Sequence, residues 1–298
     1  MSSFSRLKTV WVHVGRAGIL SFLVCLIGSR LIKAKLEGDG PVLRPFFLGD
    51  TSLWYGHAAS DTVDTGRMYL IFALIFVPMI FLIEMLTAVA YGDYLNRFLA
   101  AIRFSTGVFA SMELTDLLVA FGKVHVGWLR PDFYQRCIGY GSEDPVEPNL
   151  ENFDKVIRTN EDCSADAQMA NITQGRVSFP SGASGLAISG CFFLVLYLLY
   201  VSNRFKGSVI KQLLFLFATV PLYYGSYVGV SRIFDFRHHP VDVVGGALLG
   251  IVVSSLYYML SVSLDDESKN EPGIEWIQAP DEETDTSLYA FDAEDDDY

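Results

Sequence analysis

The chain has 298 residues, of which 51% are hydrophobic and 19% charged, and its mean hydropathy is +0.32. This hydropathy excludes an ordinary soluble domain, a collagen, a small disulfide scaffold and disorder over most of the length. The net charge of −12 resides in segment 265–298, where fourteen acidic residues accompany a single basic residue, Lys269. The rest of the chain is therefore close to neutral and offers no basic stripe to a nucleic acid.

Six apolar stretches approach the length of about 20 residues that a helix needs to cross a membrane. They are residues 17–32, 68–91, 105–122, 183–201, 209–230 and 241–262. The first lacks a small-residue cleavage site, so we expect a retained span in which Arg30 extends toward the membrane surface. Glu113 and Asp116 in the third stretch should face other helices. The sequence predicts an all-α polytopic membrane protein, with a bundle of six transmembrane helices over residues 1–264.

The long loop 123–182 indicates the orientation of the chain. It contains Asn171-Ile172-Thr173, an acceptor pattern for N-glycosylation, together with Cys137 and Cys163. Lys and Arg occur on both sides and do not decide the orientation, but glycans and disulfides belong to a lumenal or extracellular face. We therefore expect a glycan on Asn171, a Cys137–Cys163 disulfide and cytosolic termini. Plasma membrane, endoplasmic reticulum and Golgi all fit this topology.

Residues 265–298 are rich in Asp and Glu and include Pro272 and Pro280, a composition typical of a disordered cytosolic tail. A solvated tail is favoured over a docking peptide around Trp276 or Tyr289. Cytosolic partners of this tail, and a homo-oligomer of the whole chain, stay open.

Three polar clusters interrupt the apolar sequence at ends of the predicted spans. They lie at residues 123–131, 178–183 and 231–242. With six spans, all three clusters reach the same face of the membrane. We therefore expect them to form one site on the outward face.

The first part of this site suits a phosphate group. Lys123, Arg130 and Arg232 provide three cations that can hold a phosphate dianion and its transition state. Ser181 and Gly182 precede the fourth span, so unpaired backbone N–H groups and the helix dipole would point at the same anion. The residue types therefore indicate phosphoryl transfer.

The third cluster supplies a nucleophile. A neutral His238 can accept the phosphoryl group, and Asp242, four residues later on a helix that begins near Pro240, can orient it. His125 fits no catalytic role and is interpreted as structural. No cluster of His, Cys, Asp or Glu calls for a metal ion, so no cofactor is expected.

Each cluster also has a simpler interpretation. A Lys or Arg at the end of a span usually anchors it at the interface. Pro-Ser-Gly is a common helix start, and the His238-His239 pair could cap a surface helix. The coincidence of all three clusters on one face favours a catalytic site.

The motifs Lys-x6-Arg-Pro, Pro-Ser-Gly and Ser-Arg-x5-His-x3-Asp resemble the three signature motifs of the type 2 phosphatidic acid phosphatase superfamily. The six spans, the length and the sequon before the second motif are similar to its integral-membrane lipid phosphate phosphatases. The resemblance covers about residues 17–262. It implies a helical bundle and metal-independent removal of phosphate from phosphatidate, lysophosphatidate, sphingosine 1-phosphate and ceramide 1-phosphate.

The resemblance also implies a role for each motif residue. His238 would become phosphohistidine with Asp242 as its partner, and the spacing selects His238 over His239. The residues that would bind phosphate are Lys123, Arg130, Ser181, Gly182 and Arg232.

One position departs from the family pattern. The second motif of the family ends Pro-Ser-Gly-His, and this histidine protonates the leaving alkoxide, but the chain has Ala183 there. Loss of such an acid lowers a rate by about 10²–10⁴, so we interpret the chain as an inactivated variant of an active phosphatase. The alternatives are a catalytically dead, phosphatase-like protein that binds lipid or acts as a scaffold, and a membrane phosphatase for a soluble phosphate ester. An outward site at the membrane boundary favours lipid headgroups.

Overall fold

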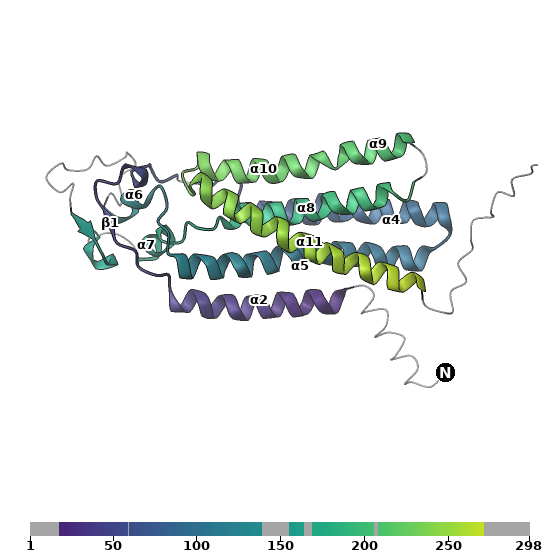
Figure 1. Ribbon diagram of the computed structural model, residues 1–298, viewed down its shortest axis with the longest axis horizontal. Coiled ribbons are helices and arrows are strands. Elements are labelled where there is room, and N and C mark those ends of the chain that lie inside the picture. Colours follow the sequence, from purple (N-terminus) through teal and green to yellow (C-terminus); the bar gives the residue numbers. More distant parts are fainter. Residues whose placement is uncertain (1–17, 59, 139–154, 164–168, 206–207, 271–298) are drawn as a thin grey trace, which may run out of the picture.

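Long helices run side by side through the molecule, and short elements gather at one end, in the computed structural model shown in Figure 1. The structure describes residues 18–58, 60–138, 155–163, 169–205 and 208–270. The bundle contains α2 (Ile19–Asp39), α3 (Thr65–Ile71), the π-helical η2 (Phe72–Phe76), α4 (Val77–Tyr91), α5 (Tyr94–Val126), α8 (Gly182–Ser202), α9 (Ser208–Phe217), α10 (Thr219–Phe234) and α11 (Pro240–Asn270). The end elements, which we call the cap, are β1 (Phe46–Phe47), η1 (Thr51–Leu53), α6 (Phe133–Cys137), β2 (Val156–Ile157), η4 (Asn160–Asp162) and α7 (Met169–Gly175).

Within the described part of the chain, five helical segments are long and apolar enough to cross a membrane. They are Thr65–Tyr91, Tyr94–Val126, Gly182–Ser202, Val209–Phe234 and Pro240–Asp265. They contain or overlap the second to sixth predicted stretches. The prediction of an all-α, polytopic membrane protein is confirmed, with β1 and β2 forming only a short antiparallel pair.

The predicted count of six spans is not confirmed, because α2 is not among these five segments. Its first 18 residues contain Arg30, Lys33 and Lys35, which limit its apolar length. However, α2 lies along α5, and it begins at the same end of the bundle at which α11 ends (Figure 1). A membrane crossing by α2 stays a prediction.

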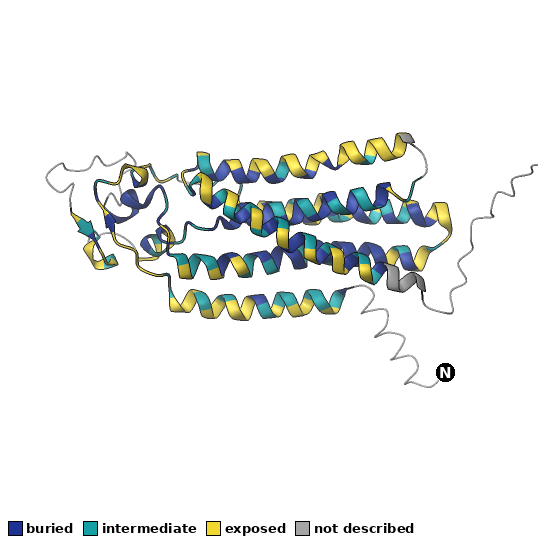
Figure 2. Cartoon of the chain, viewed as in Figure 1, coloured by how far each residue is buried: buried dark blue, intermediate teal, exposed yellow. Residues whose placement is uncertain are grey.

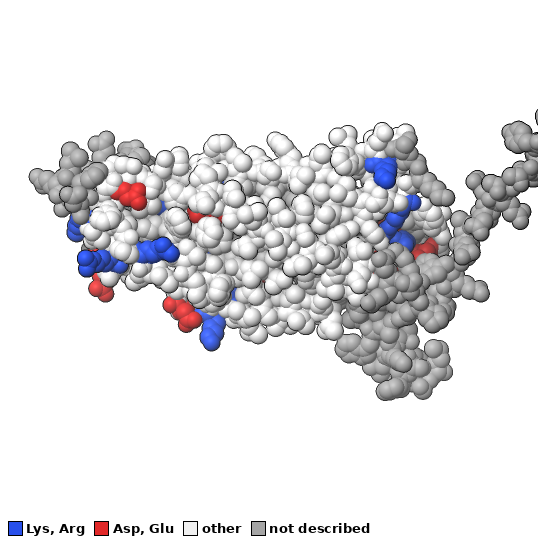
Figure 3. Space-filling model, in the orientation of Figure 1, with Lys and Arg blue, Asp and Glu red and all other residues white. Residues whose placement is uncertain are grey.

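The sides of the bundle are apolar. Exposed residues follow the outer faces of the long helices in Figure 2, and they include Leu74, Phe215 and Leu248, each more than half exposed. On the face shown in Figure 3, charged side chains gather toward the two ends, with an uncharged band between them. This distribution suits a hydrocarbon environment around the middle of the bundle.

The tight crossing of α8 and α11 positions the site. A Cβ atom on Gly246 would overlap the carbonyl oxygen of Ser181, and one on Gly250 would meet that of Gly185. Small residues allow helix backbones to approach closely within a membrane. The crossing brings the first turn of α8 against the first turn of α11, where the Ser181 N–H donates to the Asp242 carbonyl oxygen at 2.9 Å.

Two acidic residues of α5 face their neighbours, as predicted. Glu113 is buried and accepts a bond from Arg30 at 2.8 Å, while Asp116 pairs with Lys33 at 2.6 Å. Arg30 therefore has a partner on the adjacent helix, and its extension toward the membrane surface stays a prediction. Charges that interrupt the apolar face of α2 thus join α2 to α5.

A second set of ion pairs lies at the opposite end of the bundle from the cap. Glu84 accepts bonds from Arg204 at 2.9 Å and Arg97 at 3.3 Å, and Asp265 accepts one from Arg103 at 2.6 Å. Both carboxylates are buried. We call these five residues the far-end cluster, and they tie α4, α5, α11 and the segment after α8 together.

The far-end cluster includes a residue beyond position 264, where we expected the membrane domain to end and the tail to begin. We predicted that Asp265 belongs to the tail, but it is buried in the bundle and α11 continues to Asn270. The ion pair with Arg103 explains the difference, because it stabilises a charged residue at an otherwise apolar interface. The rest of the predicted tail, from residue 271, lies outside the described residues.

Candidate active site

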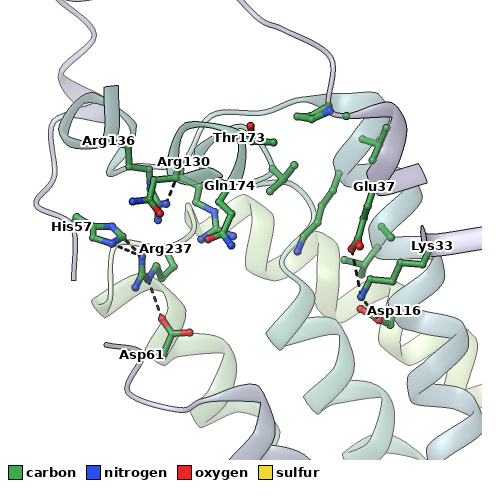
Figure 4. A pocket seen from close by; sticks show the side chains of 18 residues that line it. Lys33, Glu37, His57, Asp61, Asp116, Arg130, Arg136, Thr173, Gln174 and Arg237 are labelled. Atoms are coloured by element: carbon green, nitrogen blue, oxygen red, sulfur yellow. Dashed lines mark hydrogen bonds and ion pairs between the residues drawn. The ribbon is translucent and has the colours of Figure 1, made fainter. Parts of the chain in front are cut away.

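A cavity of about 570 Å³ lies at the cap end of α5. Arg130, Arg136 and Arg237 line one side of it, and Lys33 with Asp116 lines the other (Figure 4). The cavity thus spans from the cap to the interface of α2 and α5.

The first predicted cluster contributes two cations to this cavity. Lys123 is in the last turn of α5, which ends at Gly127 in the left-handed region with φ 60°. A Cβ atom at Gly127 would overlap the carbonyl oxygen of Val42, so glycine is required for this turn. The turn returns the chain over the bundle, and both Lys123 and Arg130 line the cavity. Burial and the nearby Arg136 lower the pKa of Arg130 to about 10, which keeps it charged at neutral pH.

The second cluster forms the start of α8 beside Lys123. Ser181 is the N-cap residue, and a Cβ atom on Gly182 would lie 3.2 Å from the Lys123 Nζ atom. The absence of a side chain at Gly182 therefore lets the ammonium group approach the unpaired N–H groups of the helix start. Ala183 is partly buried against the apolar core.

Backbone hydrogen bonds hold the first and second clusters together. The Arg130 N–H donates to the Gly175 carbonyl oxygen, and the Ser178 N–H donates to that of Trp128, both at 2.8 Å. The loop after α5 and the segment before α8 therefore form one support for the cavity.

The third cluster places His238 and Asp242 near each other without a hydrogen bond. The His238 Nδ1 atom is 3.8 Å from Asp242 Oδ2, and Nδ1 has no hydrogen-bond partner among the described residues. Asp242 Oδ2 instead accepts bonds from the Ser178 hydroxyl at 2.6 Å and the His239 N–H at 2.8 Å. Asp242 Oδ1 likewise lacks a partner among the described residues. The two residues of the predicted pair are therefore close but not hydrogen-bonded to each other.

The environment of His238 favours its neutral form. Burial, as the largest cause, and the positive charges of Arg130 and Lys123 lower the pKa of His238 to about 4, against the opposing effect of Asp242. A neutral imidazole retains the lone pair that a nucleophile requires.

A strained turn precedes His238. Phe236 has φ 50°, a region that few residues other than glycine adopt, and its ring stacks on Tyr55 with centroids 4.7 Å apart. The N–H groups of Arg237 and His238 both donate to the Arg232 carbonyl oxygen, at 3.1 and 3.3 Å. This turn separates the two side chains, since Arg237 lines the cavity while His238 is buried.

Arg232, predicted as a phosphate ligand, is engaged by carboxylates in this structure, and its role toward phosphate stays a prediction. Its guanidinium group is buried and binds Asp61 and Asp235, each at 3.0 Å, and the Val63 carbonyl oxygen at 2.8 Å. Asp61 also pairs with Arg237 at 2.9 Å. The two arginines outweigh the effect of burial and lower the pKa of Asp61. Arg237, which sequence analysis did not select, therefore takes a place in the cavity, while Arg232 is held by carboxylates.

A second network, also missed by sequence analysis, reaches the cavity from the cap. His57 Nδ1 is 2.6 Å from Asp132 Oδ2, and Arg136 binds both oxygens of Asp132 at 2.9 Å. Burial would raise the pKa of Asp132, but the hydrogen bonds from His57 and Arg136 hold it at about 2. Asp132 follows Arg130-Pro131 directly, which is a usable signal, whereas His57 lies in an irregular segment with none.

The cap carries the two predicted modification sites. Cys137 and Cys163 form a disulfide. Asn171 lies on α7 and lines the cavity, and its carbonyl oxygen accepts a bond from Arg136. Glycosylation of Asn171 stays a prediction. His125, interpreted as structural, is exposed and packs on Phe121.

Among the described residues, no group of three His, Cys, Asp or Glu side chains is arranged to hold a metal ion. The lining of the cavity supplies cations and the imidazole of His57. The start of α8 and the buried His238 adjoin two of the lining residues, Lys123 in space and Arg237 in the chain. This set suits binding of a phosphate group and its transfer to an imidazole nitrogen.

Comparison with known proteins gives a consistent result. The family model of the PAP2 superfamily matches residues 104–264, more than half of the chain and all three clusters. Phospholipid phosphatase 2 of Mus musculus is 30% identical over 262 residues, covering 83% of this chain and 84% of the relative. A probable diacylglycerol pyrophosphate phosphatase 1 of Schizosaccharomyces pombe is 28% identical over 218 residues, covering 73% and 72%. Lipid phosphate phosphatase 1 of Arabidopsis thaliana is 34% identical over 154 residues, covering 51% and 42%. No solved structure matches.

Proposed function

This chain belongs to the PAP2 superfamily, whose phosphatases it resembles along most of its length, and we propose that it dephosphorylates lipid phosphates through His238. The observation that carries the proposal is the convergence of three separate segments at the cap end of the bundle. Lys123 from α5 lies beside Gly182 at the start of α8, and Ser181 bonds to Asp242 at the start of α11. His238 lies directly before that helix.

Phosphate binding is assigned to the cations and backbone groups at the helix start. Lys123 and Arg130 line the cavity and form no ion pair within the described chain, while Gly182 and its neighbours offer unpaired N–H groups. These groups together can neutralise a dianion and the charge of its transition state. Ser181 contributes its place at the helix start and a hydroxyl group that lacks a described partner.

Arg232 takes a supporting role in this proposal. Its carbonyl oxygen accepts the His238 N–H, and its guanidinium group holds Asp61. Arg237 replaces it as the third cation that lines the cavity. Arg232 is thus a positioning residue for the turn that presents His238.

The reaction begins with the neutral imidazole of His238. Its Nε2 lone pair forms a bond to phosphorus while the bond between phosphorus and the lipid oxygen breaks. Positive charge then develops on the ring, and Asp242 can accept the Nδ1–H after a small approach from 3.8 Å. Water attacks the phosphohistidine, releases inorganic phosphate and regenerates the imidazole.

Ala183 limits the departure of the lipid oxygen. Its methyl group cannot donate a proton, and an alkoxide is a poor leaving group without one. The chain should therefore bind lipid phosphates and hydrolyse them slowly. The proposed substrates are phosphatidate, lysophosphatidate, sphingosine 1-phosphate and ceramide 1-phosphate.

The site is proposed to face the extracellular space or the lumen, with both termini in the cytosol. The disulfide in the cap supports this orientation, since disulfides persist in oxidising compartments. Protease added to sealed, right-side-out cells should spare an epitope tag at the C-terminus. Cleavage of the tag would overturn the orientation.

The central experiment compares the chain with its Ala183→His variant on the four lipid phosphates in excess EDTA. The variant should raise turnover by about 10²–10⁴ with little change in binding, the pattern of a transition-state interaction. It should also form an acid-labile, base-stable phosphoryl adduct on His238.

The presence of Ala183 favours one alternative, a phosphatase-like protein that binds lipid phosphates without hydrolysing them. A folded Ala183→His variant that binds these lipids but releases no phosphate from any of them would support this alternative. Rapid hydrolysis of sugar phosphates alone would favour a soluble substrate.

A further inference from the structure

A histidine other than the proposed nucleophile lines the cavity. His57 is the one histidine among the described residues that line this cavity, and its side chain is 36% exposed. It stands on the same side as Arg130, Arg136 and Arg237 (Figure 4). The other lining side chains that carry a proton at neutral pH are lysines and arginines, and Lys123, Arg130 and Arg237 are already assigned to holding the phosphate.

A buried carboxylate fixes the ring of His57. Asp132 is fully buried and is held at both oxygens by Arg136, so it remains a carboxylate and accepts the Nδ1–H of His57. The Nε2 atom is then the ring nitrogen that can exchange a proton with a bound molecule. A histidine oriented by a buried carboxylate is a recurrent arrangement for proton transfer.

We propose that His57, oriented by Asp132, donates the proton to the leaving lipid oxygen in this chain. This inference rests on the proposed function, because it concerns the same phosphoryl transfer. His57 would perform the step for which Ala183 has no suitable group. Asp132 is a positioning residue in this scheme, and Arg136 holds Asp132 in place.

The step balances without any further reactant. The His238 Nε2–phosphorus bond forms as the phosphorus–oxygen bond breaks, and the proton on His57 Nε2 moves to the departing oxygen, which leaves as an alcohol. Neutral His57 then accepts a proton from the water that attacks the phosphohistidine. Inorganic phosphate is released and both imidazoles return to their starting states.

The charges around His57 come from several elements. Asp132 and Arg136 face it from the cap, and Arg237 from the turn after α10 lies 3.0 Å from Nδ1 and 3.4 Å from Nε2. Asp61 binds Arg237 and offsets its charge. A bound phosphate dianion adds negative charge to the cavity and offsets the charges of its cations.

The test uses two substrates that differ in how much they need an acid. His57→Gln in the full chain should lower hydrolysis of lysophosphatidate by about 10²-fold. Hydrolysis of p-nitrophenyl phosphate, whose leaving group needs little protonation, should change less than about threefold. His125→Gln, a change at an exposed histidine outside the cavity lining, is the matched control and should leave both rates unchanged.

Two further measurements distinguish proton donation by His57 from a purely structural role of this residue. The decline of the lysophosphatidate rate at high pH, expected for an acid that must be protonated, should disappear in His57→Gln. In the Ala183→His background, His57→Gln should have a much smaller effect, since the new histidine can supply the proton.

If His57→Gln lowers the hydrolysis rates of both substrates equally, or leaves the lysophosphatidate rate unchanged, the proposed role of His57 is overturned. Complete inactivity of the parent chain toward lysophosphatidate would overturn it too. If Ala183→His is active in that case, the proposed function stands and only this inference fails. If Ala183→His is inactive and forms no adduct on His238, the proposed function fails as well.

Discussion

Arginines cluster with acidic residues at both ends of the bundle, but their surroundings differ. In the far-end cluster, Glu84 is bound by Arg97 and Arg204, and Asp265 by Arg103. At the cap end, by contrast, neither Lys123 nor Arg130 has a carboxylate partner in the part of the chain that the structure describes. The Nε atom of Arg130 also lacks a hydrogen bond there.

The paired charges of the far-end cluster hold helices together. The unpaired cations Lys123 and Arg130 are instead available to bind an anion. A buried ion pair is costly to break from one side, because the remaining charge stays uncompensated. Buried cations that form no ion pair of their own destabilise the fold slightly and gain a partner only when an anion binds. Variants at the two ends should therefore affect different measurements.

The largest effect is expected at His238, the proposed nucleophile. In the Ala183→His background, His238→Ala should lower turnover of lysophosphatidate by about 10⁴-fold or more and abolish the phosphoryl adduct. His239→Ala is the adjacent control and should retain the adduct. Turnover retained in His238→Ala would assign the nucleophile to another residue.

At the far-end cluster, the effect should appear in stability. Glu84→Ala leaves Arg97 and Arg204 without their main carboxylate and should lower the free energy of unfolding by about 3–5 kcal/mol. Thermal unfolding in detergent measures this loss. Turnover per folded molecule of the restored enzyme should not change, and a large fall would mean that the two ends are coupled.

A smaller effect should follow from the low pKa of His238. Because this pKa is about 4 in the fold and about 6.5 in an unfolded chain, the unfolded state binds the proton more readily between these values. The stability contribution is therefore complete above about pH 6.5 and falls as pH drops toward 4, by about 3 kcal/mol.

Unfolding measured across this pH range in the parent and in His238→Gln isolates this contribution. The free energy of unfolding of the parent should fall relative to that of His238→Gln as the pH drops from about 6.5 toward 4. Parallel curves would show that His238 does not experience the buried, cationic environment described above.

The smallest effect is expected for a single phosphate ligand. Lys123→Met keeps the length of the side chain and removes one charged contact, so binding of inorganic phosphate should weaken by about 10-fold. Stability should be equal or slightly higher, because an unpaired cation is lost. At the far end, Arg97→Met should show the opposite pattern, with lower stability and unchanged phosphate affinity.

The sequence predicted the spans well because apolar length is a local property. Helix α5 nevertheless begins at Tyr94, before its apolar core, since Arg97 and Arg103 are stabilised by Glu84 and Asp265. Asp265 is distant from Arg103 in sequence, so no local pattern reveals this contact. Because this contact was not evident from the sequence, the predicted end of the membrane domain, residue 264, lies too early in the chain.

The site was predictable where it lies at the ends of regular helices. Lys123, Gly182 and Asp242 stand at fixed places relative to spans, and their proximity followed from topology. His57 and Asp61 come from an irregular segment whose path depends on contacts with the cap and with Arg237. Asp61, from that segment, pairs with Arg232, a contact that no local pattern indicated.

The glycine contacts between α8 and α11 have a consequence for how this site can change. Asp242 and Gly246 are one helical turn apart, and both touch the backbone of Ser181. A single inserted residue between them would rotate one relative to the other by about 100° and shift it by about 1.5 Å. The position of Asp242 and the contact between α8 and α11 are therefore set by the same helical turn.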